Sequence, residues 1–100
     1  MDGPAGHGKA QQSDGVDDDV VLPIGTLIST MTSCSVATWV NFNTTNVGSW
    51  ERIFDFGTGT TVYMFLSPRQ STNGTMRFAI TIGSNGSESG LNSPANLSAG

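Results

Sequence analysis

Two carboxylates, Glu51 and Asp55, are the residues of this chain whose types come closest to a catalytic pair. Enzymes that hydrolyse glycosides use two carboxyl groups, about 5–5.5 Å apart in retaining enzymes and about 6.5–9.5 Å apart in inverting ones. Strand residues rise about 3.3 Å each, so carboxylates four positions apart in an extended segment lie about 13 Å apart. That separation is too large for either mechanism. We therefore expect Glu51 in solvent at a strand entrance and Asp55 as a hydrogen-bond acceptor in the following turn.

The other groups capable of chemistry lack partners in the sequence. The only histidine, His7, lies in a polar N-terminal segment, so a serine nucleophile has no base. Residues 57–59 read Gly-Thr-Gly and precede a strand, which indicates a turn rather than a phosphate-binding loop. The single cysteine, Cys34, has no second thiol for a disulfide or a metal, and we expect it to be a small buried residue. We expect no catalytic residues and no enzymatic activity.

Aromatic side chains are better candidates for function, because five of the eight lie within residues 49–68. Sugars have apolar C–H faces and polar rims, and both match an exposed aromatic ring flanked by hydrogen-bonding groups. Trp50 follows a polar loop and Tyr63 lies in an expected strand, so these two residues are the predicted ligand-binding residues. Trp39 lies between Thr38 and Val40 and is expected in the core. Packing over the end of a sheet is the alternative interpretation of Trp50.

An acidic segment near the N-terminus is the one candidate for a metal site. Calcium takes six to eight oxygen ligands, which carboxylates supply. A solvated acidic turn explains the same residues, and we expect no cofactor, with calcium as the alternative. The carboxylates are Asp14, Asp17, Asp18 and Asp19.

Four Asn-X-Ser/Thr triplets match the acceptor pattern for N-glycosylation. They matter only on a eukaryotic secretory route, and they indicate exposed loops in any case. The triplets begin at Asn43, Asn73, Asn85 and Asn96.

Composition and charge exclude several classes of partner. The net charge is −4, and the four cationic side chains are scattered along the chain. No basic patch is therefore available for nucleic acid or for an anionic membrane. No apolar run approaches the roughly 20 residues of a membrane span, and residues 1–13 do not resemble a signal peptide.

The sequence favours an all-β fold. Gly, Ser, Thr and Asn supply 44 of the 100 residues, whereas Lys and Glu, which favour surface helices, are scarce. We expect a flexible lead-in at 1–13, a single domain at 14–100, no helix and no strong strand after Gly83. Alternating apolar residues and turn signals predict strands near 20–22, 34–42, 52–56, 62–66 and 76–82, with turns at Asp14-Gly15, at 57–60 and at Asn73-Gly74.

Five segments, in this order and spacing, resemble a known family. They read DGVDD at 14–18, VLP at 21–23, VATWV at 36–40, WERIFDFG at 50–57 and MRFAI at 76–80. Together they resemble the laminin-G-like domains of the concanavalin A-like lectin and glucanase superfamily. The resemblance implies an antiparallel β-sandwich of the jelly-roll type.

The chain departs from the family pattern in four respects. Ser13 and Cys34 stand where an aromatic residue, usually Phe, is common, and Asp19 stands where an aromatic residue, often Tyr, is common. Members of the family run to about 150 residues or more, beyond the common domain size. We therefore expect an incomplete domain, lacking a Trp-His-bearing strand and the return strands that close both sheets.

The resemblance implies a non-catalytic carbohydrate-binding or accessory module of a larger secreted glycoside hydrolase or surface protein. The expected location is extracellular or at the cell surface, and the expected partner is carbohydrate, such as a plant-type polysaccharide, beside a catalytic domain of the parent chain. Two alternatives remain open: a structural or adhesion module that contacts protein, and a fragment without independent function.

Overall fold

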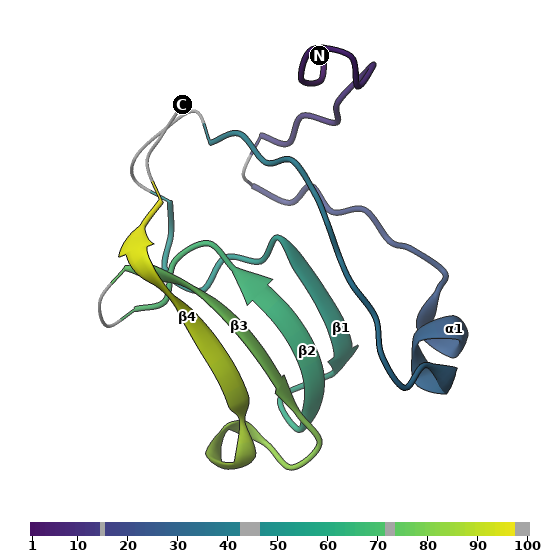
Figure 1. Cartoon of the computed structure of the whole chain (residues 1–100), viewed down its shortest axis with the longest axis vertical. Coiled ribbons are helices and arrows are strands. Elements are labelled where there is room, and N and C mark those ends of the chain that lie inside the picture. Colours follow the sequence, from purple (N-terminus) through teal and green to yellow (C-terminus); the bar gives the residue numbers. More distant parts are fainter. Residues whose placement is uncertain (15, 43–46, 72–73, 98–100) are drawn as a thin grey trace. The chain divides into compact units, whose positions relative to one another are not determined.

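Four antiparallel strands form one sheet in the order β1-β2-β3-β4 (Figure 1). The computed structural model describes residues 1–14, 16–42, 47–71 and 74–97. In these residues helix is confined to α1 (Gly25–Thr30) and the short 3-10 helix η1 (Asn85–Ser87). The expected all-β class is therefore confirmed at the level of one antiparallel sheet. The strands are β1 (Phe54–Thr58), β2 (Val62–Ser67), β3 (Thr75–Thr81) and β4 (Ser89–Asn96).

The chain divides into two units, Met1–Trp39 and Val40–Gly100, and the sheet belongs to the second. In the first unit Asp2 and Lys9 form an isolated antiparallel bridge and an ion pair between their side chains. Helix α1 lies later in this unit and buries none of its residues. No described helix is both long enough and apolar enough to cross a membrane.

The hairpin of β1 and β2 confirms the strands and the turn that the sequence predicts at 52–66. Its register runs from Phe54 opposite Leu66 to Thr58 opposite Val62. Gly59 in the turn has a φ of 60°, a left-handed conformation that glycine adopts without steric cost. The predicted turn residues and the alternating strand pattern therefore agree with each other and with the structure.

Strand β3 confirms the strand predicted at 76–82, and it pairs with β2 from Arg77 to Thr81. Phe65 lies opposite Ala79, and Ser67 lies opposite Arg77. Gly74 before β3 has a φ of 74°, and its N–H donates to the carbonyl oxygen of Gln70 at 3.1 Å. The other half of the predicted Asn-Gly turn, residue 73, lies outside the described residues.

The register gives the sheet two different faces, because successive side chains point to opposite sides of a strand. One face carries the aromatic rings of Tyr63 and Phe65 together with hydrogen-bonding groups. The opposite face is apolar, and it consists of Phe54 and Phe56 on β1, Met64 and Leu66 on β2, and Phe78 and Ile80 on β3.

Two predicted strands, at 20–22 and 34–42, are wrong. Both segments lack strand structure and are exposed apart from residue 42, which is half-buried. Cys34 is exposed rather than buried, and Trp39 exposes 74% of its surface instead of lying in the core. The physical reason is that β-branched alternation suits a pleated surface but does not supply a partner strand, and these segments have none among the described residues.

The sequence does not predict three elements of the structure: α1, the 3-10 helix η1 and β4. Helix α1 has only six residues, and so short a segment does not show the periodic apolar pattern by which a helix is predicted from sequence. Strand β4 is rich in Gly, Ser and Asn, and its side chains are almost all exposed. It pairs with β3 through backbone hydrogen bonds, for which apolar side chains are not required. The prediction of no strand after Gly83 is therefore wrong.

Gly57 is the tightest point of the β1-β2 hairpin, and its substitution tests the register. A Cβ atom there would lie 2.3 Å from the carbonyl oxygen of Val62 and 2.6 Å from the Cα atom of Tyr63. We expect Gly57→Ala to destabilise the sheet by about 1–3 kcal/mol, the usual cost of overpacking. Gly86→Ala is the matched control, because a Cβ at Gly86 has no atom within 4 Å. Thermal unfolding checks the difference, and equal melting temperatures would contradict the register.

Candidate functional site

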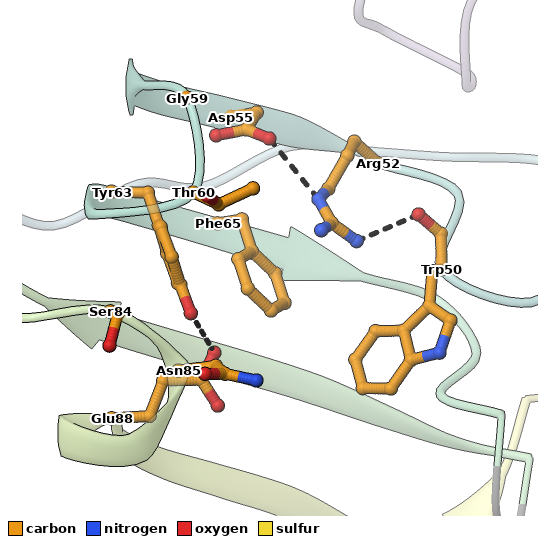
Figure 2. A pocket seen from close by; sticks show the side chains of 10 residues that line it. All are labelled: Trp50, Arg52, Asp55, Gly59, Thr60, Tyr63, Phe65, Ser84, Asn85 and Glu88. Atoms are coloured by element: carbon orange, nitrogen blue, oxygen red, sulfur yellow. Dashed lines mark hydrogen bonds and ion pairs between the residues drawn. The ribbon is translucent and has the colours of Figure 1, made fainter.

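An open pocket of about 540 Å³ lies over the aromatic face of the sheet (Figure 2). Its walls come from β1, β2, the turn between them, the segment that leads into β1, and the region of η1. It is lined by Trp50, Arg52, Asp55, Gly59, Thr60, Tyr63, Phe65, Ser84, Asn85 and Glu88. The pocket therefore combines three aromatic rings with charged, amide and hydroxyl groups.

Phe65 lies at the centre of the aromatic part of the pocket and exposes only 3% of its surface. The ring of Trp50 meets it edge-on, with centroids 6.3 Å apart and an interplanar angle of 85°. The ring of Tyr63 lies 5.5 Å away, tilted by 32°. Both geometries are favourable for aromatic pairs. The two predicted ligand-binding residues, Trp50 and Tyr63, therefore both pack against the buried ring of Phe65.

Arg52 covers the face of Phe65 and joins two walls of the pocket. Its guanidinium carbon lies 3.8 Å from the centroid of the Phe65 ring, within the range of a cation-π interaction. Its Nη1 donates to the carbonyl oxygen of Trp50 at 2.7 Å, and its Nε donates to Oδ2 of Asp55 at 3.2 Å. The carboxylate of Asp55 therefore accepts from Arg52 and, among the described residues, from no group of the turn, so its predicted role as an acceptor in the turn is wrong.

Glu88 connects the pocket to β3, because its largely buried carboxylate accepts hydrogen bonds from both. The phenol of Tyr63 donates to Oε1 of Glu88 at 2.8 Å, and Nη2 of Arg77 donates to Oε2 at 2.7 Å. Arg77 also donates to Oδ1 of Asn92 at 3.0 Å. A Cβ at Gly90 would lie 2.7 Å from Arg77 Nη2, so the guanidinium lies close over a glycine of β4.

These contacts shift the titration of Glu88 and Tyr63. Burial disfavours the charged carboxylate, but the hydrogen bonds from Arg77 and Tyr63 outweigh it, so the pKa of Glu88 lies below its usual 4.5. Burial raises the pKa of the Tyr63 phenol above its usual 10.0, and the hydrogen bond to Glu88 raises it further. At neutral pH the pair is therefore a carboxylate that accepts from a protonated phenol.

Trp50 is held in a backbone conformation that is rare for its type. Its φ is 65°, in the left-handed region, which costs a residue with a Cβ about 1–2 kcal/mol. The N–H of Trp50 donates to the carbonyl oxygen of Arg69 at 2.7 Å, and that oxygen also accepts from the buried hydroxyl of Ser67 at 3.0 Å. The guanidinium of Arg69 donates to the carbonyl oxygen of Val47 at 2.9 Å. Arg69, in the loop after β2, therefore holds the backbone of Trp50 and of the segment that precedes it.

The structure brings Trp50 and Tyr63 into the same pocket. Of the two carboxylates considered for catalysis, one lines this pocket and the other does not. Asp55 lines the pocket. Glu51 is exposed, as predicted, and its Oε1 accepts from the N–H of Gly48 at 2.7 Å. No residue pattern around Glu88 indicates a role at the pocket, because its hydrogen-bond partners, Tyr63 and Arg77, are distant in the sequence.

The acidic segment of the first unit has the features of an exposed turn. Ligand atoms of Asp14, Asp17 and Asp18 lie within 4.8 Å of one another, and Asp19 is not part of this group. Asp18 accepts from the N–H of Asp14 at 2.7 Å, and Asp14 accepts from the N–H of Val16 at 2.9 Å. Counted as one ligand oxygen from each carboxylate, this group supplies three, whereas calcium takes six to eight. The predicted Asp-Gly turn at this point includes residue 15, which lies outside the described residues.

Two of the four glycosylation triplets begin at described residues. Asn85 is exposed in η1 at the pocket, and Asn96 is the last residue of β4. The triplets at 43 and 73 begin outside the described residues.

The chain matches no family model, no curated protein and no solved structure. The likeness to laminin-G-like domains therefore rests on the sequence segments alone.

The hydrogen bonds of Glu88 predict a dependence of stability on pH. Because the folded state lowers the pKa of Glu88, its contribution is fully present above about pH 4.5 and is lost as the pH falls through the lowered value. We expect Glu88→Gln to cost about 1.5 kcal/mol at pH 7 and progressively less in acid, measured by thermal unfolding. Asp19→Asn, an exposed carboxylate outside the pocket, is the control. A loss in Glu88→Gln that stays constant down to pH 3 would contradict the assignment.

Proposed function

We propose that the pocket is the carbohydrate-binding site of a non-catalytic module. The observation that carries the proposal is that Trp50 and Tyr63 pack against Phe65 in one open pocket whose other walls carry hydrogen-bonding groups. A sugar ring needs this combination, because its C–H face is apolar and its hydroxyl groups require donors and acceptors at the edge.

The accessibility of the groups supports binding rather than packing alone. Trp50 exposes 40% of its surface although its ring contacts Phe65, so part of the indole remains available to a ligand. Asn85 and Thr60 are exposed at the pocket and offer amide and hydroxyl groups.

The state of the carboxylates favours a site without catalysis. Glu88 accepts from two donors and has a lowered pKa, which suits a structural acceptor and not a general acid. Asp55 accepts a hydrogen bond from Arg52, so its carboxylate already has a partner within the pocket.

We also propose that the sheet is one layer of a laminin-G-like jelly-roll sandwich in a secreted or surface protein. The apolar face of the sheet supports this proposal. Ile80 on this face exposes 44% of its surface, and Leu91 of β4, which lies opposite Phe78, exposes 74%. Apolar side chains at such positions are typical of a face that packs against a second layer. The same face favours the alternative, a structural or adhesion module that contacts protein.

Substitution of Trp50 tests the carbohydrate site. We expect Trp50→Ala to weaken binding at least about tenfold, equivalent to about 1.4 kcal/mol, because the exposed indole edge is lost. Trp39→Ala is the matched control, since Trp39 is the only other tryptophan, is exposed and does not line the pocket. Binding is measured by affinity electrophoresis on a panel of plant and bacterial polysaccharides, with circular dichroism to verify the fold.

A second substitution separates the ring of Tyr63 from its hydroxyl group. Tyr63→Phe keeps the ring but removes the donor to Glu88, so we expect a smaller loss of binding than in Tyr63→Ala. If all variants bind as the unaltered protein does, or if none of the polysaccharides is retained, the carbohydrate proposal is wrong and the protein-contact alternative gains support.

A further inference from the structure

We infer that the pocket selects uncharged glycans over acidic ones, and that Asp55 is the residue that sets this selectivity. The inference rests on the proposed carbohydrate function and adds the chemical class of the ligand. It follows from the balance of charges among the pocket residues.

Among the described residues that line the pocket, Arg52 is the one cationic side chain, and its charge is compensated by Asp55. Its Nε donates to Asp55, which lines the pocket beside it, and its Nη1 donates to the carbonyl oxygen of Trp50. The second carboxylate of the lining, Glu88, is paired with Arg77 outside it. The lining therefore has one cation, Arg52, and two carboxylates, and Arg77 outside the lining is paired with one of those carboxylates.

An acidic sugar would meet an unfavourable field in this pocket. Binding a uronate or a sulfate next to Arg52 brings the new anion close to Asp55, and like charges across an interface oppose association. The anion would also have to compete with Asp55 for the same guanidinium. The net charge of −4 on the whole chain adds no long-range attraction for a polyanion.

Hydroxyl groups, in contrast, match what the pocket leaves available. The third nitrogen of the guanidinium, Nη2 of Arg52, has no partner among the described residues, and Figure 2 shows it directed toward the inside of the pocket. A hydroxyl group both accepts and donates, so neighbouring hydroxyls of one sugar can accept from this nitrogen and donate to a carboxylate oxygen of Asp55. Asp55 thereby serves twice, as an acceptor for the neutral ligand and as a charge that excludes an acidic one.

The test compares two forms of one polysaccharide that differ in charge, polygalacturonate and its methyl-esterified form, together with neutral arabinan, xylan and β-glucan. We expect the unaltered protein to retain at least one neutral polysaccharide and not polygalacturonate. Binding to the neutral polysaccharide should not change between about 0.05 and 0.5 M NaCl, because no ion pair with the ligand is screened.

Asp55→Asn removes the excluding charge and keeps the shape of the side chain. We expect this variant to gain at least fivefold in affinity for polygalacturonate at low salt, and to lose that gain at high salt. Asp19→Asn makes the same change in net charge on an exposed residue outside the pocket and should not produce the gain. Asp55 is itself about half exposed, so we expect the variant to fold, which its thermal unfolding verifies.

The outcomes separate the inference from the proposed function. If the unaltered protein binds polygalacturonate more tightly than every neutral polysaccharide, or if Asp55→Asn and Asp19→Asn behave alike, the selectivity is refuted while carbohydrate binding stands. If no polysaccharide of either class is retained, the proposed function fails and the inference fails with it. The salt response of the unaltered protein remains a test even if Asp55→Asn does not fold.

Discussion

The buried ring of Phe65 is the contact on which the pocket depends. Trp50 meets it edge-on, Tyr63 packs beside it, and the guanidinium of Arg52 covers it at 3.8 Å. Each of these residues comes from the hairpin or from the segment just before it, so one ring fixes a set of groups that the chain supplies over a short distance. The opposite partner on β3, Ala79, is fully buried and leaves the space that the ring needs. Loss of this ring would remove the common support of all three pocket residues.

The part of the fold that the sequence predicts correctly is the part in which local signals agree. For β1, β2 and β3, alternating side chains coincide with Gly-containing turns, and adjacent strands then pair in sequence order. The segments at 20–22 and 34–42 have the alternation but lack a partner strand among the described residues, so the same signal fails there. Strand β4 is the opposite case. It has no alternating apolar pattern, yet it forms a strand because it pairs with β3.

The candidate site also contains residues that the sequence predicts and residues that it does not predict. Trp50 and Tyr63 were predicted from residue type and from their place beside a turn, and the structure places both in one pocket. Glu88 could not be predicted, because it reaches Tyr63 only when β3 and β4 are in register and Arg77 lies over Gly90. The left-handed backbone of Trp50 is likewise a feature that no residue pattern indicates. The register of β3 with β4 and one unusual backbone angle are therefore the features of the site that the sequence does not predict.

The most direct test of the central claim uses the two tryptophans as reporters in one sample. The indole N–H signals of Trp50 and Trp39 are assigned by substitution and followed by NMR while an uncharged oligosaccharide, prepared from the best-retained neutral polysaccharide, is added. We expect a saturable shift of the Trp50 signal and no shift of the Trp39 signal. Equal shifts of both signals, a shift of Trp39 alone, or no shift at saturating sugar would contradict the proposed carbohydrate-binding site.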